Sequence, residues 1–174
     1  MMLTGGSPTM HPALVNELTH FAHEKDIFIT IETEGSHFLP TDYPINLLSI
    51  SPKFSNSVPV VGVLTPQGGV TDERMVKRHN KFRLNYEAIS NSIAYHLDYH
   101  IKPVFDKELS MIGEVEEFLE KLNIPDHKVW AMPAGDDIPA LLESYGPVMD
   151  MVRDRGWRFT PRPHIIGFGT QREV

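Results

Sequence analysis

The first eight residues, Met1-Met2-Leu3-Thr4-Gly5-Gly6-Ser7-Pro8, decide how the rest of the chain is interpreted. They read as the end of a buried strand that runs into a glycine turn. Because two adjacent glycines lack Cβ atoms, the backbone of this turn can approach a ligand closely. A helical pattern of apolar residues follows from Leu14 to Ala22. A strand, a glycine turn and a helix in this order place a ligand-binding loop at the C-terminal end of a strand in α/β proteins.

The composition narrows the classes of function. The chain has 174 residues, 41% of them hydrophobic, which suits one domain with a real core. Its net charge of −7 argues against a general binder of nucleic acid or of acidic membranes. No apolar run approaches the ~20 residues of a membrane span, and the N-terminus lacks the features of a signal peptide. We therefore expect a cytoplasmic protein without nucleic-acid or membrane partners.

Cysteine is absent from the sequence. This absence removes disulfides, thiolate zinc sites and cysteine-held iron–sulfur clusters from these residues. Nine histidines are present but scattered. His20 and His23 have i,i+3 spacing, yet no third partner is evident, so a solvated helix face is favoured over a metal site.

Strands alternate with helices along the chain, which predicts a parallel α/β sheet. The expected strands are residues 1–4, 27–31, 45–50, 99–105, 128–132 and 157–160. The first of these is short, since strands usually run about 5–6 residues. We therefore expect an incomplete β/α barrel with mostly parallel strands that misses its first βα unit. The single domain would span residues 1–174, with an irregular insertion at 54–81 and a C-terminal tail at 161–174.

Helices are expected between these strands. Apolar spacing predicts them over residues 82–97 and 109–122, and a further one that Asp136 or Asp137 caps and Gly156 ends. A basic cluster, residues 77–81, precedes the first of these and reads as a solvated helix start.

Three successive strand ends carry small or polar residues: Gly5 to Ser7, Glu32 to Ser36 and Ser51 to Lys53. Parallel strands place all their C-terminal ends on one side of a sheet. We therefore expect Gly5, Gly6, Ser7, Glu32, Ser51 and Lys53 to surround one concave site.

These strand ends resemble motifs of the radical S-adenosylmethionine superfamily and, within it, of 7-carboxy-7-deazaguanine synthase. Leu3 to Pro8 is similar to the Thr-Gly-Gly-Glu-Pro motif of that family. Ile31 to Ser36 resembles its Glu-Thr-Asn-Gly-Thr/Ser motif, and Ser51-Pro52-Lys53 matches its Ser-Pro-Lys motif.

Three later stretches continue the resemblance in the same order. They are Ile101 to Val104, similar to Leu-Lys-Phe-Val; Trp130 to Gly135, similar to Leu-Met-Pro-Glu-Gly; and the tail from Thr160 to Val174. A lone Gly-Gly-x-Pro is weak evidence, but six ordered matches across the whole chain are strong.

The resemblance implies a chemistry and a set of site residues. A 4Fe–4S cluster would cleave S-adenosylmethionine reductively, and the resulting radical would take hydrogen from a pterin-like substrate, 6-carboxy-tetrahydropterin, with Mg²⁺ present. The implied cofactor-binding residues are Gly5, Gly6, Ser7, Pro8, Glu32, Ser51 and Lys53. The implied substrate-binding residues are Thr33, Gly35, Lys102, Met132, Pro133, Arg162 and His164. No catalytic residue is assigned.

Three departures from the family pattern bear on activity. Ser7 stands in place of the motif glutamate, and Glu34 stands in place of the motif asparagine. The cluster-binding Cys-x-x-x-Cys-x-x-Cys loop is absent. We therefore expect the C-terminal portion of such an enzyme, which holds none of the cofactors tightly and is inactive by itself.

Two other interpretations stay open. The chain could be a non-catalytic α/β module that binds a nucleotide or a partner, or it could derive from another organic radical activating enzyme. Glu32 could also simply cap a helix or pair with Lys53. Because a missing βα unit would leave apolar surface near Leu3, Ile29 and Ile31, we expect a homodimer along that edge.

Overall fold

The structure is a computed structural model that describes residues 1–5, 7–65 and 68–169. Within the expected span of 1–174, contacts divide the chain into two compact units, Met1–Tyr99 and His100–Val174. Each unit is described by itself. None of the helices in the described ranges combines the length and the apolar character needed to cross a membrane.

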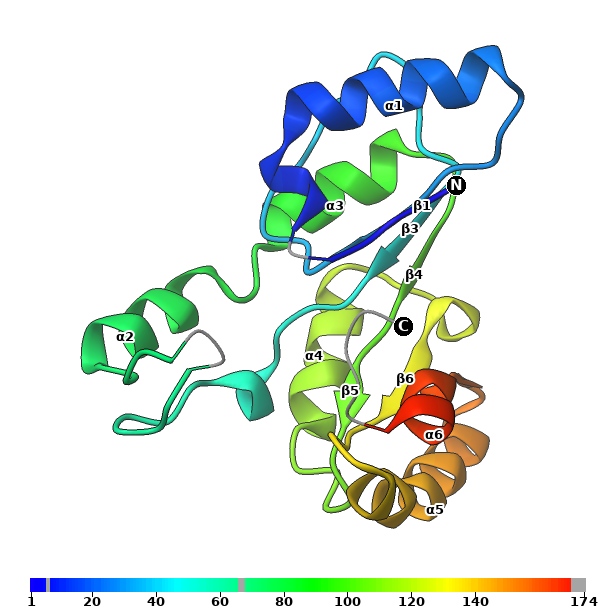
Figure 1. Cartoon of the computed structure of the whole chain (residues 1–174). Coiled ribbons are helices and arrows are strands. Elements are labelled where there is room, and N and C mark those ends of the chain that lie inside the picture. Colours follow the sequence, from blue (N-terminus) through cyan, green and yellow to red (C-terminus); the bar gives the residue numbers. More distant parts are fainter. Residues whose placement is uncertain (6, 66–67, 170–174) are drawn as a thin grey trace. The chain divides into compact units, whose positions relative to one another are not determined.

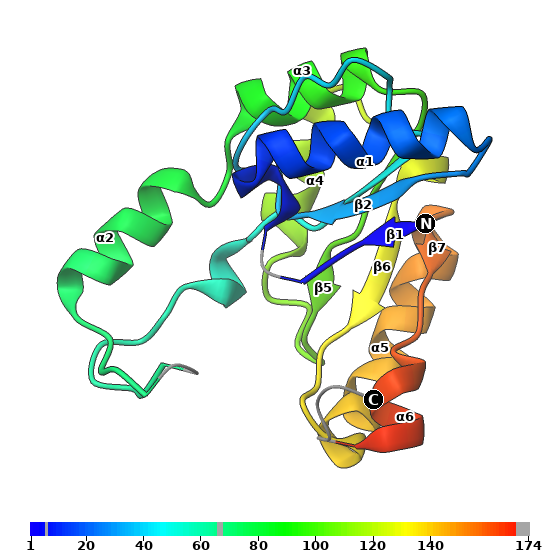
Figure 2. The same ribbon diagram turned by 45° about the horizontal axis from the view of Figure 1, so that its top comes forward.

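A parallel sheet forms the centre of the first unit. Its strands lie in the order β1 (Met2–Leu3), β2 (Thr30–Thr33) and β3 (Leu47–Ile50). Strand β4 (Tyr99–Ile101) begins at the last residue of this unit. The pairs β1–β2 and β2–β3 are parallel, and Leu3 lies opposite Ile31 in the first pair. Figures 1 and 2 show α1 (Pro12–Glu24) and α3 (Tyr86–Tyr95) together over one face of this sheet. The expected α/β architecture with parallel strands is therefore confirmed.

Strand β2 begins and ends later than the sequence indicates. The apolar run predicts a strand over 27–31, with Glu32 and Thr33 in the turn that follows. Both residues instead belong to β2, where Glu32 pairs with Ser49 and Thr33 with Ile50. Pairing on the other side starts only at Met2 opposite Thr30, because β1 supplies just Met2 and Leu3.

The stretch expected to be irregular, residues 54–81, contains two helices. They are the 3-10 helix η2 (Ser55–Ser57) and α2 (Glu73–Phe82). Helix α2 begins where Asp72 Oδ1 accepts a hydrogen bond from the N–H of Met75, at 2.8 Å. The expectation of irregular structure is therefore wrong for α2, whose cap was not recognised because few apolar residues follow it. The next helix, α3, correspondingly starts at Tyr86 rather than at residue 82.

The second unit has a parallel sheet of its own. Its order is β5-β6-β7, with β5 (Val104–Phe105), β6 (Trp130–Pro133) and β7 (Arg158–Phe159). Its helices are α4 (Ile112–Lys121), η3 (Asp126–Lys128), α5 (Ile138–Arg155) and α6 (Pro163–Phe168). Asp137 caps α5 by accepting from Ala140 N–H at 2.9 Å, and Gly156 ends it with φ 67°, as expected. The tail was expected to be without periodic structure, but it contains α6.

The exposed apolar side chains at the edge of the first sheet are not the ones that the sequence predicts. Ile29 and Ile31 are buried, with 2% and 0% of their surface accessible, so the expected apolar patch does not include them. The reason is that β2 lies between β1 and β3 and not at the edge. Met2 and Phe28 are instead the exposed apolar side chains there, each 61% accessible. The homodimer stays a prediction.

His96 should make the stability of the first unit depend on pH. Its side chain is buried, and Nδ1 accepts a hydrogen bond from the N–H of Ile45 at 3.1 Å. Burial lowers the pKa of His96 below its ordinary value of 6.5, and a hydrogen bond with the backbone of Leu39 offsets only part of this effect. The folded state therefore disfavours the protonated imidazole.

We expect the chain to lose stability as the pH falls below about 6.5, because the unfolded state then takes up a proton that folded His96 does not. The loss is at most about 1.4 kcal/mol per pH unit and ends at the lower pKa of the folded state. His96→Asn, which keeps an acceptor for Ile45, should reduce this slope in urea unfolding followed from about pH 7.5 to about pH 5.5. His11→Asn, at an exposed position, is the control. Equal slopes for the wild type and His96→Asn would contradict the assignment.

Candidate functional site

A hollow of about 390 Å³ lies at the C-terminal ends of β1, β2 and β3. We call it the strand-end site. Its lining residues are Thr4, Gly5, Ser7, Glu32, Thr33, Glu34, Ser51 and Lys53. The predicted grouping of Gly5, Ser7, Glu32, Ser51 and Lys53 around one concave surface is thus observed, while their role in binding a cofactor stays a prediction. Gly6, also predicted, lies outside the described residues.

The parallel register brings these residues to one edge. Leu3 lies opposite Ile31, and Thr33 lies opposite Ile50. The three strands therefore end at similar heights, and the residues that follow them meet. The N–H of Ser51 donates to the carbonyl of Thr33 at 2.7 Å and extends the pairing one residue beyond β3.

The glycine turn leads directly from β1 into the 3-10 helix η1 (Pro8–Met10). Gly5 has φ 80°, a conformation that side-chain-bearing residues rarely adopt. Pro8 starts η1 and is buried. It is absent from the lining of the strand-end site, so its contribution there is to fix the direction of the turn.

Glu34, which lines the site, accepts hydrogen bonds from two side chains. Its Oε1 accepts from Ser7 Oγ at 2.9 Å and also from the hydroxyl of Ser36. Burial raises the pKa of Glu34, but the hydrogen bonds from Ser36, from its own backbone and from Ser7, together with the charge of Lys53, outweigh it. The net pKa is lowered, and the carboxylate is ionised at neutral pH.

Glu32 has a different partner. Thr4 Oγ1 donates to Glu32 Oε2 at 2.7 Å. This contact joins the end of β1 to the end of β2. It differs from both alternatives that the sequence left open for Glu32, a helix cap and a pair with Lys53. The site therefore offers two carboxylates, one ammonium and several hydroxyl groups within one hollow.

This donor set fits the polar groups of S-adenosylmethionine. An ammonium group needs carboxylate or carbonyl acceptors, which Glu32, Glu34 and the turn backbone can provide. A carboxylate needs a cation such as Lys53, and ribose hydroxyls bind hydroxyl or carboxylate partners. Charge-assisted hydrogen bonds of this kind are stronger than neutral ones.

Thr33 and Gly35, which are expected to contact substrate, also stabilise the loop after β2 and its packing. Thr33 Oγ1 accepts from the N–H of Gly35 at 3.1 Å. Gly35 has φ 80°, and a Cβ there would lie 2.7 Å from Ile89 and 3.1 Å from Ile50. The glycine is thus required by the packing of α3 on the sheet. A substrate role for either residue stays a prediction.

The other expected substrate residues belong to the second unit. Met132 and Pro133 lie in β6, and Lys102 lies between β4 and β5. Arg162 and His164 lie at the start of α6, where Arg162 Nη1 donates to the carbonyl of Gly135 at 2.7 Å. Their substrate contacts stay predictions.

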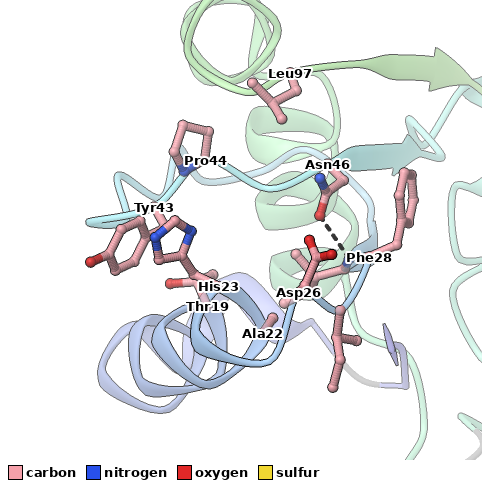
Figure 3. A pocket seen from close by; sticks show the side chains of 11 residues that line it. Thr19, Ala22, His23, Asp26, Phe28, Tyr43, Pro44, Asn46 and Leu97 are labelled. Atoms are coloured by element: carbon pink, nitrogen blue, oxygen red, sulfur yellow. Dashed lines mark hydrogen bonds between the residues drawn. The ribbon is translucent and has the colours of Figure 1, made fainter.

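A second hollow, of about 450 Å³, lies at the other end of β2, next to α1 (Figure 3). Asn46 Oδ1 accepts from the N–H of Ile29 at 2.8 Å, and the ring of His23 stacks on Tyr43 with centroids 3.8 Å apart. Its polar side chains therefore hold a loop against the helix, and we do not assign it a ligand.

The histidines of α1 lie at the surface, as the sequence suggests, and they also contact neighbouring side chains. Close to the stacked His23, His20 Nε2 lies 2.7 Å from Asp42 Oδ2. No group of three or more His, Cys, Asp or Glu side chains that could hold a metal ion occurs among the described residues.

Comparison with characterised proteins identifies relatives of this chain. It is 30% identical over 171 residues to 7-carboxy-7-deazaguanine synthase from Halobacterium salinarum, covering 95% of this chain and 63% of that protein. It is 26% identical over 172 residues to 7-carboxy-7-deazaguanine synthase from Rhodopirellula baltica, covering 99% of this chain and 62% of that protein. The chain resembles the 7-carboxy-7-deazaguanine synthases. It spans somewhat less than two thirds of the length of these relatives, and no protein-family model matches it.

Solved structures share the fold. QueE from Escherichia coli superposes with a TM-score of 0.59 at 20% identity, over 92% of this chain and 55% of that one. A domain of pyruvate-formate lyase-activating enzyme from Bacteroides vulgatus superposes with a TM-score of 0.56 at 16% identity, over 93% and 98%. At these identities the likeness concerns the fold, and it agrees with the expected α/β architecture with mostly parallel strands.

The sequence did not predict that Glu34 lines the strand-end site and contacts Ser7. From the sequence, Ser7 and Glu34 are two separate departures from 7-carboxy-7-deazaguanine synthase motifs, yet the two side chains are in contact. The signal that could have revealed this was the pairing itself, since one motif loses an acidic residue and its neighbour gains one.

The packing role of Gly35 can be tested by substitution. Gly35→Ala should destabilise the chain by about 1–3 kcal/mol more than Gly5→Ala, because both glycines have φ 80° but only a Cβ at position 35 would meet other atoms. Urea unfolding of the two variants measures the difference. Equal losses would mean that α3 does not pack on Gly35 as described.

Proposed function

We propose that this chain binds S-adenosylmethionine in the strand-end site and forms the cofactor- and substrate-binding part of a 7-carboxy-7-deazaguanine synthase. The observation that carries the proposal is the meeting of three motif-bearing strand ends around one polar hollow. Sequence similarity to the two relatives extends through nearly the whole chain and supports the same assignment.

Glu34 is the group that we assign to the ammonium of the cofactor. Its carboxylate lines the hollow and is ionised at neutral pH. Ser7, at the position of the motif glutamate, donates to it at 2.9 Å. Glu34 therefore supplies a negative charge next to the position at which the motif has its glutamate.

Other lining groups would bind and orient the rest of the cofactor. Lys53 would attract its carboxylate, and the hydroxyl of Ser51 and the carboxylate of Glu32 would bind its ribose. The backbone of Gly5 would approach the methionyl part, since no Cβ blocks it. Each contact fixes orientation, which is the contribution of such groups to catalysis.

The reductant of this reaction class is a 4Fe–4S cluster. These 174 residues contain no cysteine, and the described ones contain no other group suited to a metal ion. They do not fit a cysteine-held cluster. The part that we assign to this chain is therefore binding and positioning, and no step of the reaction is assigned to its residues.

Titration calorimetry with S-adenosylmethionine tests the proposal. Removing a hydrogen-bonded charge costs about 1.5–3 kcal/mol, so Glu34→Gln should weaken binding by about ten- to a hundredfold. Glu24→Gln, at an exposed site on α1, should have no effect. Methylthioadenosine, which lacks the amino acid, should bind weakly to the wild type and Glu34→Gln alike. Equal affinity of the wild type for both compounds would favour the non-catalytic nucleotide-binding alternative.

If Glu34 takes the role of the motif glutamate, moving the carboxylate back to position 7 should restore binding of S-adenosylmethionine. Ser7→Glu alone should weaken binding of S-adenosylmethionine, because it removes the hydrogen bond that Ser7 donates to Glu34 and places a second, larger side chain in the same part of the hollow. Glu34→Asn alone should also weaken it, by removing the charge. The double variant Ser7→Glu with Glu34→Asn should bind about as tightly as the wild type. Tighter binding by Ser7→Glu alone would show that Glu34 does not supply the missing carboxylate.

A further inference from the structure

Helix α2 forms one wall of a third hollow, of about 500 Å³. We call it the α2 pocket. It lies beside the strand-end site, since Glu34 and Lys53 line both. The other lining residues that matter here are Met10, Met75, Arg78, His79, Phe82 and Arg83. All belong to the first unit, and the guanidinium of Arg83 ties the end of the helix to the carbonyl of Lys53 at 3.2 Å.

The α2 pocket is positively charged although the chain is acidic. Lys53, Arg78 and Arg83 line it against a single carboxylate, that of Glu34, in a chain of net charge −7. In the part of the chain that the structure describes, neither Lys53 nor Arg78 forms an ion pair with a carboxylate. The charged side chains that line the pocket thus carry a net positive charge.

His79 supplies a second observation in the same place. Its Nδ1 is buried and has no hydrogen-bond partner among the described residues. Burial, Arg83 and Lys53 together lower the pKa of this histidine. A neutral ring with an unused polar atom therefore faces the cations, and buried polar atoms of this kind usually have a partner.

The same pocket contains exposed apolar side chains. Met10, Met75 and Phe82 are 58%, 42% and 52% accessible, and α2 buries none of its residues within the chain. Apolar surface, convergent charged groups and this volume are typical of small-molecule sites. The ligand that complements them is an anion with a flat apolar body.

We propose that the α2 pocket binds the substrate or product of the proposed reaction through its ring and its carboxylate, with the ring against Phe82 and Met75 and the carboxylate on Arg78. This inference rests on the proposed function. The name of the relatives specifies a product of this chemistry, a deazaguanine ring with one carboxylate. A ligand here would lie next to S-adenosylmethionine in the strand-end site, as a reaction between the two requires.

Only part of the basic cluster 77–81 belongs to the α2 pocket. From the sequence, we expect the whole cluster to be a solvated helix start. In the structure Arg78 and His79 line the α2 pocket, whereas Lys77 and Lys81 do not. Lys77 is exposed on the same helix, so Lys77→Gln removes one charge from α2 without touching the pocket.

Binding of 7-carboxy-7-deazaguanine to the chain, followed by titration calorimetry, tests the proposal. Arg78→Gln should weaken it about tenfold or more, as expected for loss of a charged hydrogen bond, and Lys77→Gln should leave it unchanged. 7-Deazaguanine, which lacks the carboxylate, should bind the wild type more weakly and should not respond to Arg78→Gln. Phe82→Ala should weaken binding of both compounds. Arg78→Lys, which keeps the charge, should recover part of the loss.

Failure of the α2 pocket proposal and failure of the proposed function give different results in these binding experiments. S-adenosylmethionine affinity should be unchanged in Arg78→Gln, because this residue does not line the strand-end site. Equal effects of Arg78→Gln and Lys77→Gln, or equal affinity for the two deazaguanines, would overturn the α2 pocket as a carboxylate site even if S-adenosylmethionine binds. Absence of S-adenosylmethionine binding together with carboxylate-dependent ring binding would overturn the proposed function instead.

Discussion

The parallel pairing of β1, β2 and β3 is the constraint on which the site depends. Because the strands run in one direction and are aligned so that Leu3 faces Ile31 and Thr33 faces Ile50, three loops distant in sequence end at one edge. A shift of one residue would turn every side chain of a strand to the other face of the sheet. The buried Ile31 and Ile50 therefore hold in place the polar residues that follow them.

A single contact, from Ser7 to Glu34, gives the hollow its chemical character. It joins the glycine turn to the loop after β2 and helps to keep a carboxylate ionised inside a partly buried space. With Lys53 opposite, the site carries both signs of charge, which suits a zwitterionic amino acid ligand better than a simple anion. The neighbouring α2 pocket differs in having cations and apolar surface, so the two hollows favour different molecules.

The order of the elements and the meeting of the strand ends could be predicted from the sequence, because apolar runs alternate with helical patterns and parallel strands end on one side. Helix α2 could not, since only its cap at Asp72 indicates it and few apolar residues follow. The need for Gly35 also escaped prediction, because it depends on Ile89 from a helix far along the chain. The contact of Ser7 with Glu34 depends on turn geometry, including φ 80° at Gly5, which sequence spacing does not specify.

The central claim is that the cofactor binds where the three strand ends meet, and amide chemical shifts of the ¹⁵N-labelled chain test it most directly. Added S-adenosylmethionine should shift the amides of Gly5, Glu34 and Ser51, which line the strand-end site. It should leave unchanged the amides of His23, Tyr43 and Asn46, which line the hollow at the opposite end of β2. Shifts confined to the second group, or no shifts at all, would contradict the account.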